Sequence, residues 1–163
     1  MQGNKGESTE LGRSKLAVYR LLKFRPRTEF ELRSKLKEKE FSSLIIDQTL
    51  IYFKNIDLVN DEKFAKGWLQ SRLKKPFGLN RIKRELKAKG IDNILIQSVC
   101  ADRPDQDEEV NAIEELATRR LRQYRHLPPL KARQRLTAYL IRRGFRPSAV
   151  YKSLTKLFKK NER

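Results

Sequence analysis

The sequence predicts an all-α protein in which three tandem three-helix repeats form an elongated, curved array. Apolar residues recur three and four positions apart along most of the chain, which is typical of helices that pack on one face. The same apolar pattern occurs three times, and proline or glycine separates the expected helices. Because only 38% of the 163 residues are hydrophobic, against about 45–50% in an average globular domain, we expect several thin cores and not one deep core.

The first expected helix of each repeat is the one that precedes a proline break. These helices span residues 15–24, 61–73 and 107–124, and the breaks follow at Pro26, Pro76, Pro128 and Pro129. The predicted organisation is a disordered tail over residues 1–13 and repeats over residues 14–57, 58–103 and 104–163. The tail is assigned as disordered because it is polar, and its lack of an apolar stretch also argues against a secretory signal.

Five apolar columns define the repeat in the second and third helices. They consist of Leu32, Ile82 and Leu136; Leu36, Leu86 and Leu140; Phe41, Ile91 and Phe145; Ile46, Ile96 and Val150; and Leu50, Cys100 and Leu154. The first two columns are four residues apart in every repeat, so they lie on one helix face. We expect these residues, together with Trp68 in the helix before them, to form the cores.

The turns between the second and third helices differ among the repeats. Gly90 and Gly144 directly follow the second helix in repeats two and three, where a left-handed residue is favoured. Repeat one has Glu40 at this position, so its turn is expected to be less favourable. The third helices are expected to begin at Ser42, Asp92 and Pro147.

The charge distribution predicts a polyanionic partner. The chain has 38 Lys and Arg against 20 Asp and Glu, a formal net charge of +18. Residues 105–115 contain six acids and no base, whereas residues 116–160 contain fourteen bases and no acid. Helix dipoles favour acids before a helix and bases near its end, but they do not explain so long a run without a carboxylate. We therefore predict a basic face on the third repeat.

Catalytic and metal-binding patterns are not found in the sequence. Cys100 stands in an apolar column and is expected to be a buried hydrophobic residue. His126 at a helix end is expected to be a surface or capping residue, and these two residues do not supply the about four ligands of a structural zinc site. The acids from Asp105 to Glu109 lack the spacing and the glycine of an EF-hand. With no phosphate loop, HExxH or GxSxG and no apolar run of membrane-spanning length, we expect a cytoplasmic, monomeric protein that is not an enzyme and needs no cofactor.

The motifs of the second repeat resemble those of the RecX family. DEKFAKGWLQSR followed by FGLNRIKRELKAKGI is similar to two signatures of that family, and RPRTEFELRSKL and LIRRGF in the other repeats resemble two more. The similarity covers residues 15–159, and it departs from the family pattern at Glu40 and Asn60, both in turns or caps. The matching residues of the second repeat are Asp61, Phe64, Ala65, Arg72, Gly78, Ile82, Glu85, Leu86, Lys89, Gly90 and Ile91.

The resemblance implies a regulator that binds the nucleoprotein filaments of the RecA recombinase, along their helical groove, without catalytic residues. It implies modulation, and in most members inhibition, of the recombinase, ATPase and coprotease activities of RecA. Regulation of DNA repair, homologous recombination and the SOS response would follow. Whether this chain inhibits or supports RecA stays open at this point.

Seven basic residues are the candidate contacts with the filament or with DNA. Lys131, Arg135 and Arg142 form a stripe away from Leu136 and Leu140 on the second helix of repeat three. The other four are Arg81 and Arg84 on the equivalent helix of repeat two, and Arg119 and Arg122 on the long helix of repeat three. A solvated surface that keeps the protein soluble is the alternative for each of these residues.

Two tyrosines and one acid have local interpretations. Tyr139 and Tyr151 lie among the basic residues and would permit stacking on nucleic-acid bases, although contacts between helices are the favoured interpretation. Glu85 is expected to pair with Lys89 one helical turn later.

Two other functional classes remain as alternatives. A direct DNA-binding protein of helix-turn-helix type is one, but no single helix is richer than the others in base-reading side chains. A basic protein of the membrane surface is the other, but here the apolar stripes are matched within the repeats. Weak, non-specific binding to single- or double-stranded DNA is expected beside binding to RecA.

Overall fold

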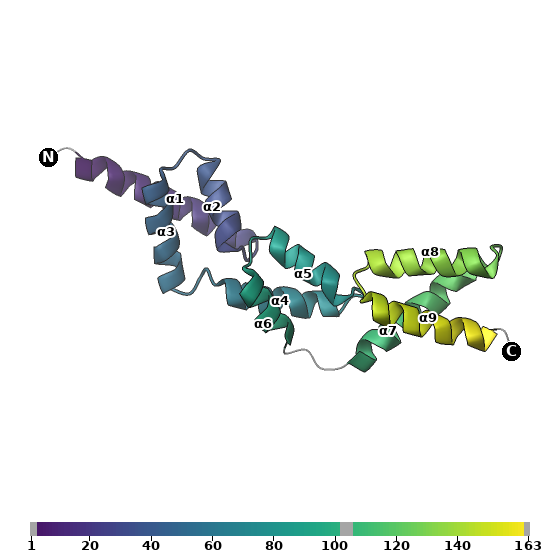
Figure 1. Cartoon of the computed structure of the whole chain (residues 1–163). Helices are drawn as coiled ribbons and strands as arrows, with labels where there is room; N and C mark the ends of the chain where they lie inside the picture. The colour runs from purple at the N-terminus through teal and green to yellow at the C-terminus, as the bar shows by residue number, and fades with distance from the viewer. Residues whose placement is uncertain (1–2, 102–105, 162–163) are drawn as a thin grey trace. The chain divides into compact units, whose positions relative to one another are not determined.

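The computed structural model describes residues 3–101 and 106–161. In these residues it contains nine α-helices, one 3₁₀ helix and no strand, so the all-α prediction is confirmed (Figure 1). The chain forms two compact units. The first unit consists of the residues up to 68 together with residues 86–96, and the second consists of residues 69–85 together with the residues from 97 onward. The first unit contains the first repeat, the second contains the third repeat, and the helices of the second repeat are divided between them.

The first repeat consists of α1 (Gly3–Phe24), α2 (Glu29–Lys37) and α3 (Ser43–Asn55). Thr28 and Glu31 form a capping box at the start of α2, and Ser42 caps α3 as predicted. Phe53 is fully buried, and the rings of Tyr19 and Tyr52 meet it edge-on with centroids 4.8 and 5.3 Å away. The buried core of this repeat is formed by Val18, Leu32, Leu36, Ile46, Leu50, Phe53 and Val59.

Helix α1 begins well before the predicted start of the first repeat. Residues 3–13, which we predicted to be a disordered tail, lie in this helix instead; residues 1 and 2 lie outside the described part of the chain. Polar contacts with the start and middle of α3 hold the part of α1 from Glu10 to Ser14. The Glu10 carboxylate accepts a hydrogen bond from the Ser42 amide at 3.3 Å, and the buried hydroxyls of Ser14 and Thr49 hydrogen-bond to each other.

The second repeat consists of α4 (Asp61–Leu73), α5 (Leu79–Ala88) and α6 (Asn93–Ala101). The Asn60 side chain caps α4 by accepting the Lys63 amide at 2.9 Å, and Asp92 accepts the Ile94 amide at 2.8 Å. Trp68 is half-buried and stacks on Phe64 with centroids 5.7 Å apart. All five predicted core positions of this repeat are buried, namely Ile82, Leu86, Ile91, Ile96 and Cys100.

The third repeat consists of α7 (Gln106–Leu121), the 3₁₀ helix η1 (Arg122–Tyr124), α8 (Pro129–Arg142) and α9 (Pro147–Asn161). Among the acids considered for a metal site, Glu109 has a described side chain, and it is buried. Its carboxylate accepts the Arg146 amide at 3.2 Å and the Arg146 guanidinium at 2.6 Å, so it holds the start of α9. The core of the repeat includes Ile113, Ala117, Leu136, Leu140, Phe145, Val150 and Leu154.

Consecutive repeats are joined by hydrogen bonds to the main chain at the ends of their second helices. At the first joint, the Thr28 hydroxyl before α2 donates to the Lys89 carbonyl after α5 at 2.7 Å. At the second joint, the amides of Gly78 and Asn80 donate to the carbonyls of Arg143 and Gly144, both at 3.0 Å. In both joints, the start of the second helix in one repeat meets the end of the second helix in the next repeat.

The joints explain why two of the three turns need glycine. Gly90 and Gly144 have φ values of +79° and +90°, as predicted for residues that end a helix. A Cβ atom would overlap the Phe30 side chain at Gly90 and the Arg81 backbone at Gly144. Glu40 also has a positive φ, of 61°, which confirms the predicted unfavourable turn, but its side chain is exposed. Glycine is therefore required by both backbone conformation and space at the two joints.

Candidate functional site

The predicted basic stripe on α8 is present in the structure. Lys131, Arg135 and Arg142 are exposed, while Leu136 and Leu140 are fully buried. On a helix with 3.6 residues per turn, the three basic positions fall within about 40° of one another. None of the three forms an ion pair within the described part of the chain. The stripe thus presents three uncompensated positive charges to solvent.

The acids that precede the basic segment neutralise only a few of its charges. Glu109 pairs with Arg146 at 2.6 Å, Glu114 with Lys156 at 3.1 Å, and Glu115 with Arg119 at 2.8 Å. No acid occurs between residues 116 and 160 to pair with the other bases. Over the residues that the structure describes, most of the positive charge of the third repeat is therefore available to an external anion.

The four remaining candidate residues have different surroundings. Arg84 and Arg122 are exposed, and the Arg84 side chain donates to the Asn80 carbonyl at 3.3 Å. Arg119 is exposed but paired with Glu115, as described above. Arg81 is half-buried, pairs with Glu85 at 2.9 Å, and lies 3.9 Å above the Phe77 ring. Arg81 was predicted to point outward; its side chain is 40% exposed and also makes these local contacts.

Sequence reasoning missed a series of arginines and aromatic rings that alternate in space. The guanidinium of Arg143 lies 5.5 Å from the Phe77 centroid and 5.1 Å from the Tyr139 centroid. The guanidinium of Arg120 lies 5.0 Å from Tyr139 and 5.7 Å from Tyr124. We call this set the Arg–aromatic ladder, and it consists of Arg81, Phe77, Arg143, Tyr139, Arg120 and Tyr124.

Part of the ladder has a signal in the sequence. Arg120 and Tyr124, like Tyr139 and Arg143, are four residues apart, which brings their side chains together on one helix face. Tyr139 packs against the core of the third repeat, in agreement with the favoured interpretation of a contact between helices. Tyr151 is 55% exposed, so the same interpretation does not hold for it.

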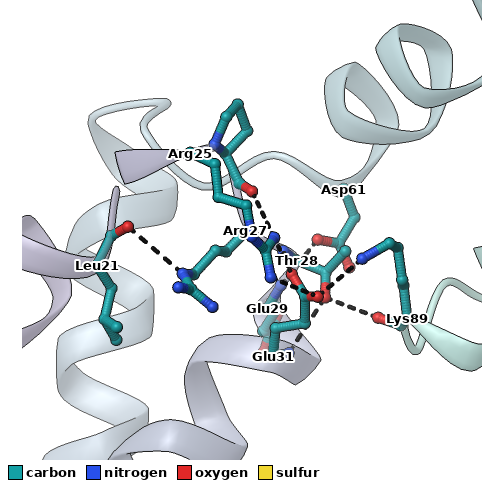
Figure 2. Close-up of polar contacts among 9 residues, drawn as sticks. Leu21, Arg25, Arg27, Thr28, Glu29, Glu31, Asp61 and Lys89 are labelled. Carbon is teal, nitrogen blue, oxygen red and sulfur yellow. Dashed lines mark hydrogen bonds and ion pairs between the residues drawn. The ribbon is translucent and has the colours of Figure 1, made fainter. Parts of the chain in front are cut away.

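Two motif residues, Glu31 and Lys89, meet in a polar cluster at the first joint (Figure 2). The Glu31 carboxylate accepts two hydrogen bonds from Arg25, at 2.9 and 3.1 Å, and one from Lys89 at 2.9 Å. Burial by itself would raise the pKa of Glu31, but the hydrogen bonds from Arg25 and Lys89 outweigh it and lower the pKa to about 2. The Lys89 ammonium also lies 4.4 Å above the Trp68 ring.

This cluster corrects the predicted pair of Glu85 and Lys89. Lys89 pairs with Glu31, whereas Glu85 pairs with Arg72 at 2.7 Å and with Arg81. The pair of Glu31 and Lys89 therefore joins the first and second repeats, whereas the pairs of Glu85 lie within the second repeat.

We expect Glu31→Gln to lower the free energy of unfolding at pH 7 and to flatten its dependence on acid pH. The folded-state pKa is depressed from 4.5 to about 2, so the carboxylate stabilises the fold above pH 4.5, and this contribution is lost as the pH falls toward 2. The corresponding free energy is at most about 3 kcal/mol. Urea unfolding of both proteins at pH 7, 4.5 and 3 measures it. Glu38→Gln, which removes an exposed carboxylate, is the control, and a wild-type pH profile in the Glu31 variant would contradict this assignment.

Other candidate chemistry is limited in the described residues. No group of three or more His, Cys, Asp or Glu side chains is placed to hold a metal ion there. Within the same residues, no helix combines the length and the apolar character needed to cross a membrane. Cys100 is 5% exposed, as predicted, and His126 is exposed in the turn after η1.

The fold and the surface define the class of protein as a set of tandem three-helix repeats with a basic stripe on the third repeat. Three family models match it in order: the first three-helix domain of RecX over residues 15–53, the second over 60–99 and the third over 107–154. The chain therefore belongs to the RecX family, which confirms the resemblance noted in the sequence.

Relatives and solved structures agree with this assignment. Regulatory protein RecX of Pasteurella multocida is 37% identical over 131 residues, covering 80% of this chain and 79% of that protein. Regulatory protein RecX of Clostridium acetobutylicum is 30% identical over 138 residues, covering 83% and 64%. The crystal structure of RecX from Lactobacillus salivarius superposes with a TM-score of 0.82 at 20% identity, covering 92% of this chain and 97% of that one. A second crystal structure of a regulatory protein RecX has the same TM-score at 21% identity, covering 93% and 74%.

Proposed function

We propose that this protein binds the nucleoprotein filaments of the RecA recombinase and inhibits the recombinase, ATPase and coprotease activities of RecA. Through this inhibition it regulates homologous recombination, DNA repair and the SOS response. It acts in the cytoplasm as a monomer. Membership of a family whose members are named regulatory proteins supports a role in regulation, and the uncompensated basic stripe of Lys131, Arg135 and Arg142 is the observation that favours a filament as the target.

The physical basis of the proposal is the match between a linear polyanion and a tandem basic array. A filament on DNA offers a track of phosphates and acidic side chains, and basic residues on successive repeats can contact several points of it. Each phosphate that is neutralised releases condensed counterions, which makes binding favourable and dependent on salt. The described ion pairs leave the stripe on α8 without an internal partner, so its contacts with the filament need not break any salt bridge first.

A charge-reversed variant of the stripe tests the proposal. We expect Lys131→Glu, Arg135→Glu, Arg142→Glu to remain folded, because all three side chains are exposed, and to lose inhibition of DNA-dependent ATP hydrolysis by RecA by about tenfold or more. If the three residues contact phosphates of single-stranded DNA, the log–log salt slope of binding becomes shallower by about 2. A steady-state ATPase titration and a melting curve measure both properties on the same sample.

The matched control reverses three exposed lysines of the first repeat, Lys23, Lys37 and Lys39, so that the net charge changes by the same amount. We expect this control to keep more of the inhibition than the α8 variant. Full inhibition by a folded α8 variant, or equal loss in both variants, would reject the stripe as the contact surface.

Direct binding to DNA is the second candidate function. Each repeat has the three-helix organisation that helix-turn-helix domains also have. A pull-down on RecA filaments and on bare single-stranded DNA at the same salt concentration separates the two candidates. If the protein bound bare DNA as tightly as the filament and left ATP hydrolysis unchanged, the DNA-binding function would replace the proposed one.

A further inference from the structure

A small pocket lies beside the centre of the Arg–aromatic ladder. It has a volume of about 160 Å³, and its polar lining comes from Arg119, Arg120, Gln123, Tyr139 and Arg143. Every one of these side chains offers a hydrogen-bond donor, and no carboxylate lines the pocket. Its chemistry is therefore that of a site for an anion.

The two central arginines are held in place without a carboxylate partner. Arg120 and Arg143 lie over the same Tyr139 ring, at 5.0 and 5.1 Å from its centroid. Their hydrogen bonds in the described part of the chain go to neutral oxygens: the Tyr124 hydroxyl at 3.3 Å and the Pro76 carbonyl at 3.3 Å. The hydrogen bond to Tyr124 raises the pKa of the Arg120 guanidinium above its ordinary value.

This arrangement is suited to an anion. The guanidinium groups of Arg120 and Arg143 lie 5.0 and 5.1 Å from the centroid of the same ring, and an anion beside that ring is attracted to both positive charges. The rings and the neutral hydrogen bonds already fix both guanidinium planes, so binding does not require much further ordering of the side chains. A third charge is nearby, because the exposed pair of Arg119 and Glu115 is weak and easily exchanged.

We propose that this pocket binds a phosphodiester group of the DNA backbone. Arginine, glutamine and tyrosine side chains are typical donors to backbone phosphates, and an arginine fork matches the geometry of phosphate oxygens. The net charge of +18 brings the protein to DNA in preference to neutral ligands. The inference deepens the proposed function, since it assigns to the third repeat a specific contact with the DNA inside the filament.

The experiment measures binding of the full chain to a fluorescent single-stranded oligonucleotide at several salt concentrations, without RecA. We expect the double variant Arg120→Gln, Arg143→Gln to bind about three- to tenfold more weakly than wild type and to lose about 0.7 of the log–log salt slope, as for one phosphate contact. The control variant Arg125→Gln, Lys152→Gln removes the same charge from two exposed positions outside the pocket, and its binding should change less than the pocket variant's.

A charge-conserving variant distinguishes a specific phosphate site from non-specific electrostatic attraction to DNA. Arg120→Lys, Arg143→Lys keeps the net charge but loses the planar fork, and we expect it to bind DNA more weakly than wild type. Melting curves check that every variant is folded. If the glutamine variant matched its control, or the lysine variant bound like wild type, the pocket would be rejected as a phosphate site.

The effect on RecA activity is measured separately from DNA binding. Loss of DNA binding in the pocket variant, with no effect of the wild-type protein on RecA, would support the phosphate site and reject the proposed function. Unchanged DNA binding with lost inhibition of RecA would reject the phosphate site, leave the proposed function standing and point to an acidic protein surface as the occupant of the pocket. A competition arm with polyglutamate tests that occupant directly.

Discussion

Gly144→Ala is expected to lower the free energy of unfolding by about 3 kcal/mol, which is large for the addition of one methyl group. Two costs add at this position. The residue has a φ of +90°, which L-residues with a side chain rarely adopt, and the new Cβ atom would overlap the backbone of Arg81. Backbone atoms cannot rotate away as a flexible side chain can, so α5 and the end of α8 must move apart. Urea unfolding at equilibrium measures the loss.

The same substitution at Gly67 is the matched control. Gly67 lies within α4, and a Cβ atom there would meet nothing within 4 Å. Since alanine is favoured over glycine inside a helix by about 1 kcal/mol, Gly67→Ala should stabilise the protein. Opposite signs for the two variants are the expected result, and a neutral or stabilising Gly144→Ala would show that the second joint is not packed as described.

Phe53→Ala is expected to cost about 3–5 kcal/mol, the range for a large side chain removed from a well-packed core. Phe53 is fully buried at the end of the first repeat's core, and the rings of Tyr19 and Tyr52 close over it from two helices. A small repeat has few other residues that can fill the resulting cavity. Thermal and urea unfolding of the variant measure the cost.

Phe24→Ala provides the comparison for this variant. Phe24 ends α1 and is 84% exposed, so the same change of side chain removes little buried area. We expect a change within about 0.5 kcal/mol. Equal effects of the two substitutions would contradict the core assignment of Phe53.

The fold was predictable because its main determinant is periodic. The first two core columns lie four positions apart in every repeat, and all six of their residues are fully buried, as Leu32, Ile82 and Leu136 show for the first column. The third column is less uniform, since Phe41 is only partly buried whereas Ile91 and Phe145 are buried. The caps were also predictable, since Ser42, Asn60 and Asp92 act on amides only a few residues away. The helix from Gly3 was missed because polar contacts, such as that of Glu10 with Ser42, leave no apolar pattern.

The candidate site was less predictable because its contacts are distant in sequence. The stripe on α8 follows from one helical period, and the structure places it as expected. The ladder depends on Phe77 and Arg143, which are close only because the second joint brings the start of α5 to the end of α8. In the same way, Lys89 pairs with Glu31 and not with its neighbour Glu85, because the first joint brings Glu31 and Lys89 together.

The second joint also has a consequence for how freely sequences of this fold can diverge. Its hydrogen bonds run from the amides of Gly78 and Asn80 to the carbonyls of Arg143 and Gly144, so they depend on the main chain and not on the identity of most side chains. Substitution at the joint is restricted chiefly at Gly78 and Gly144, where an added methyl group meets backbone. Neighbouring residues can then change type over evolutionary time while the repeats keep their register. Two RecX structures that share only 20% and 21% of their residues with this chain, yet superpose with a TM-score of 0.82, are what such a tolerance produces.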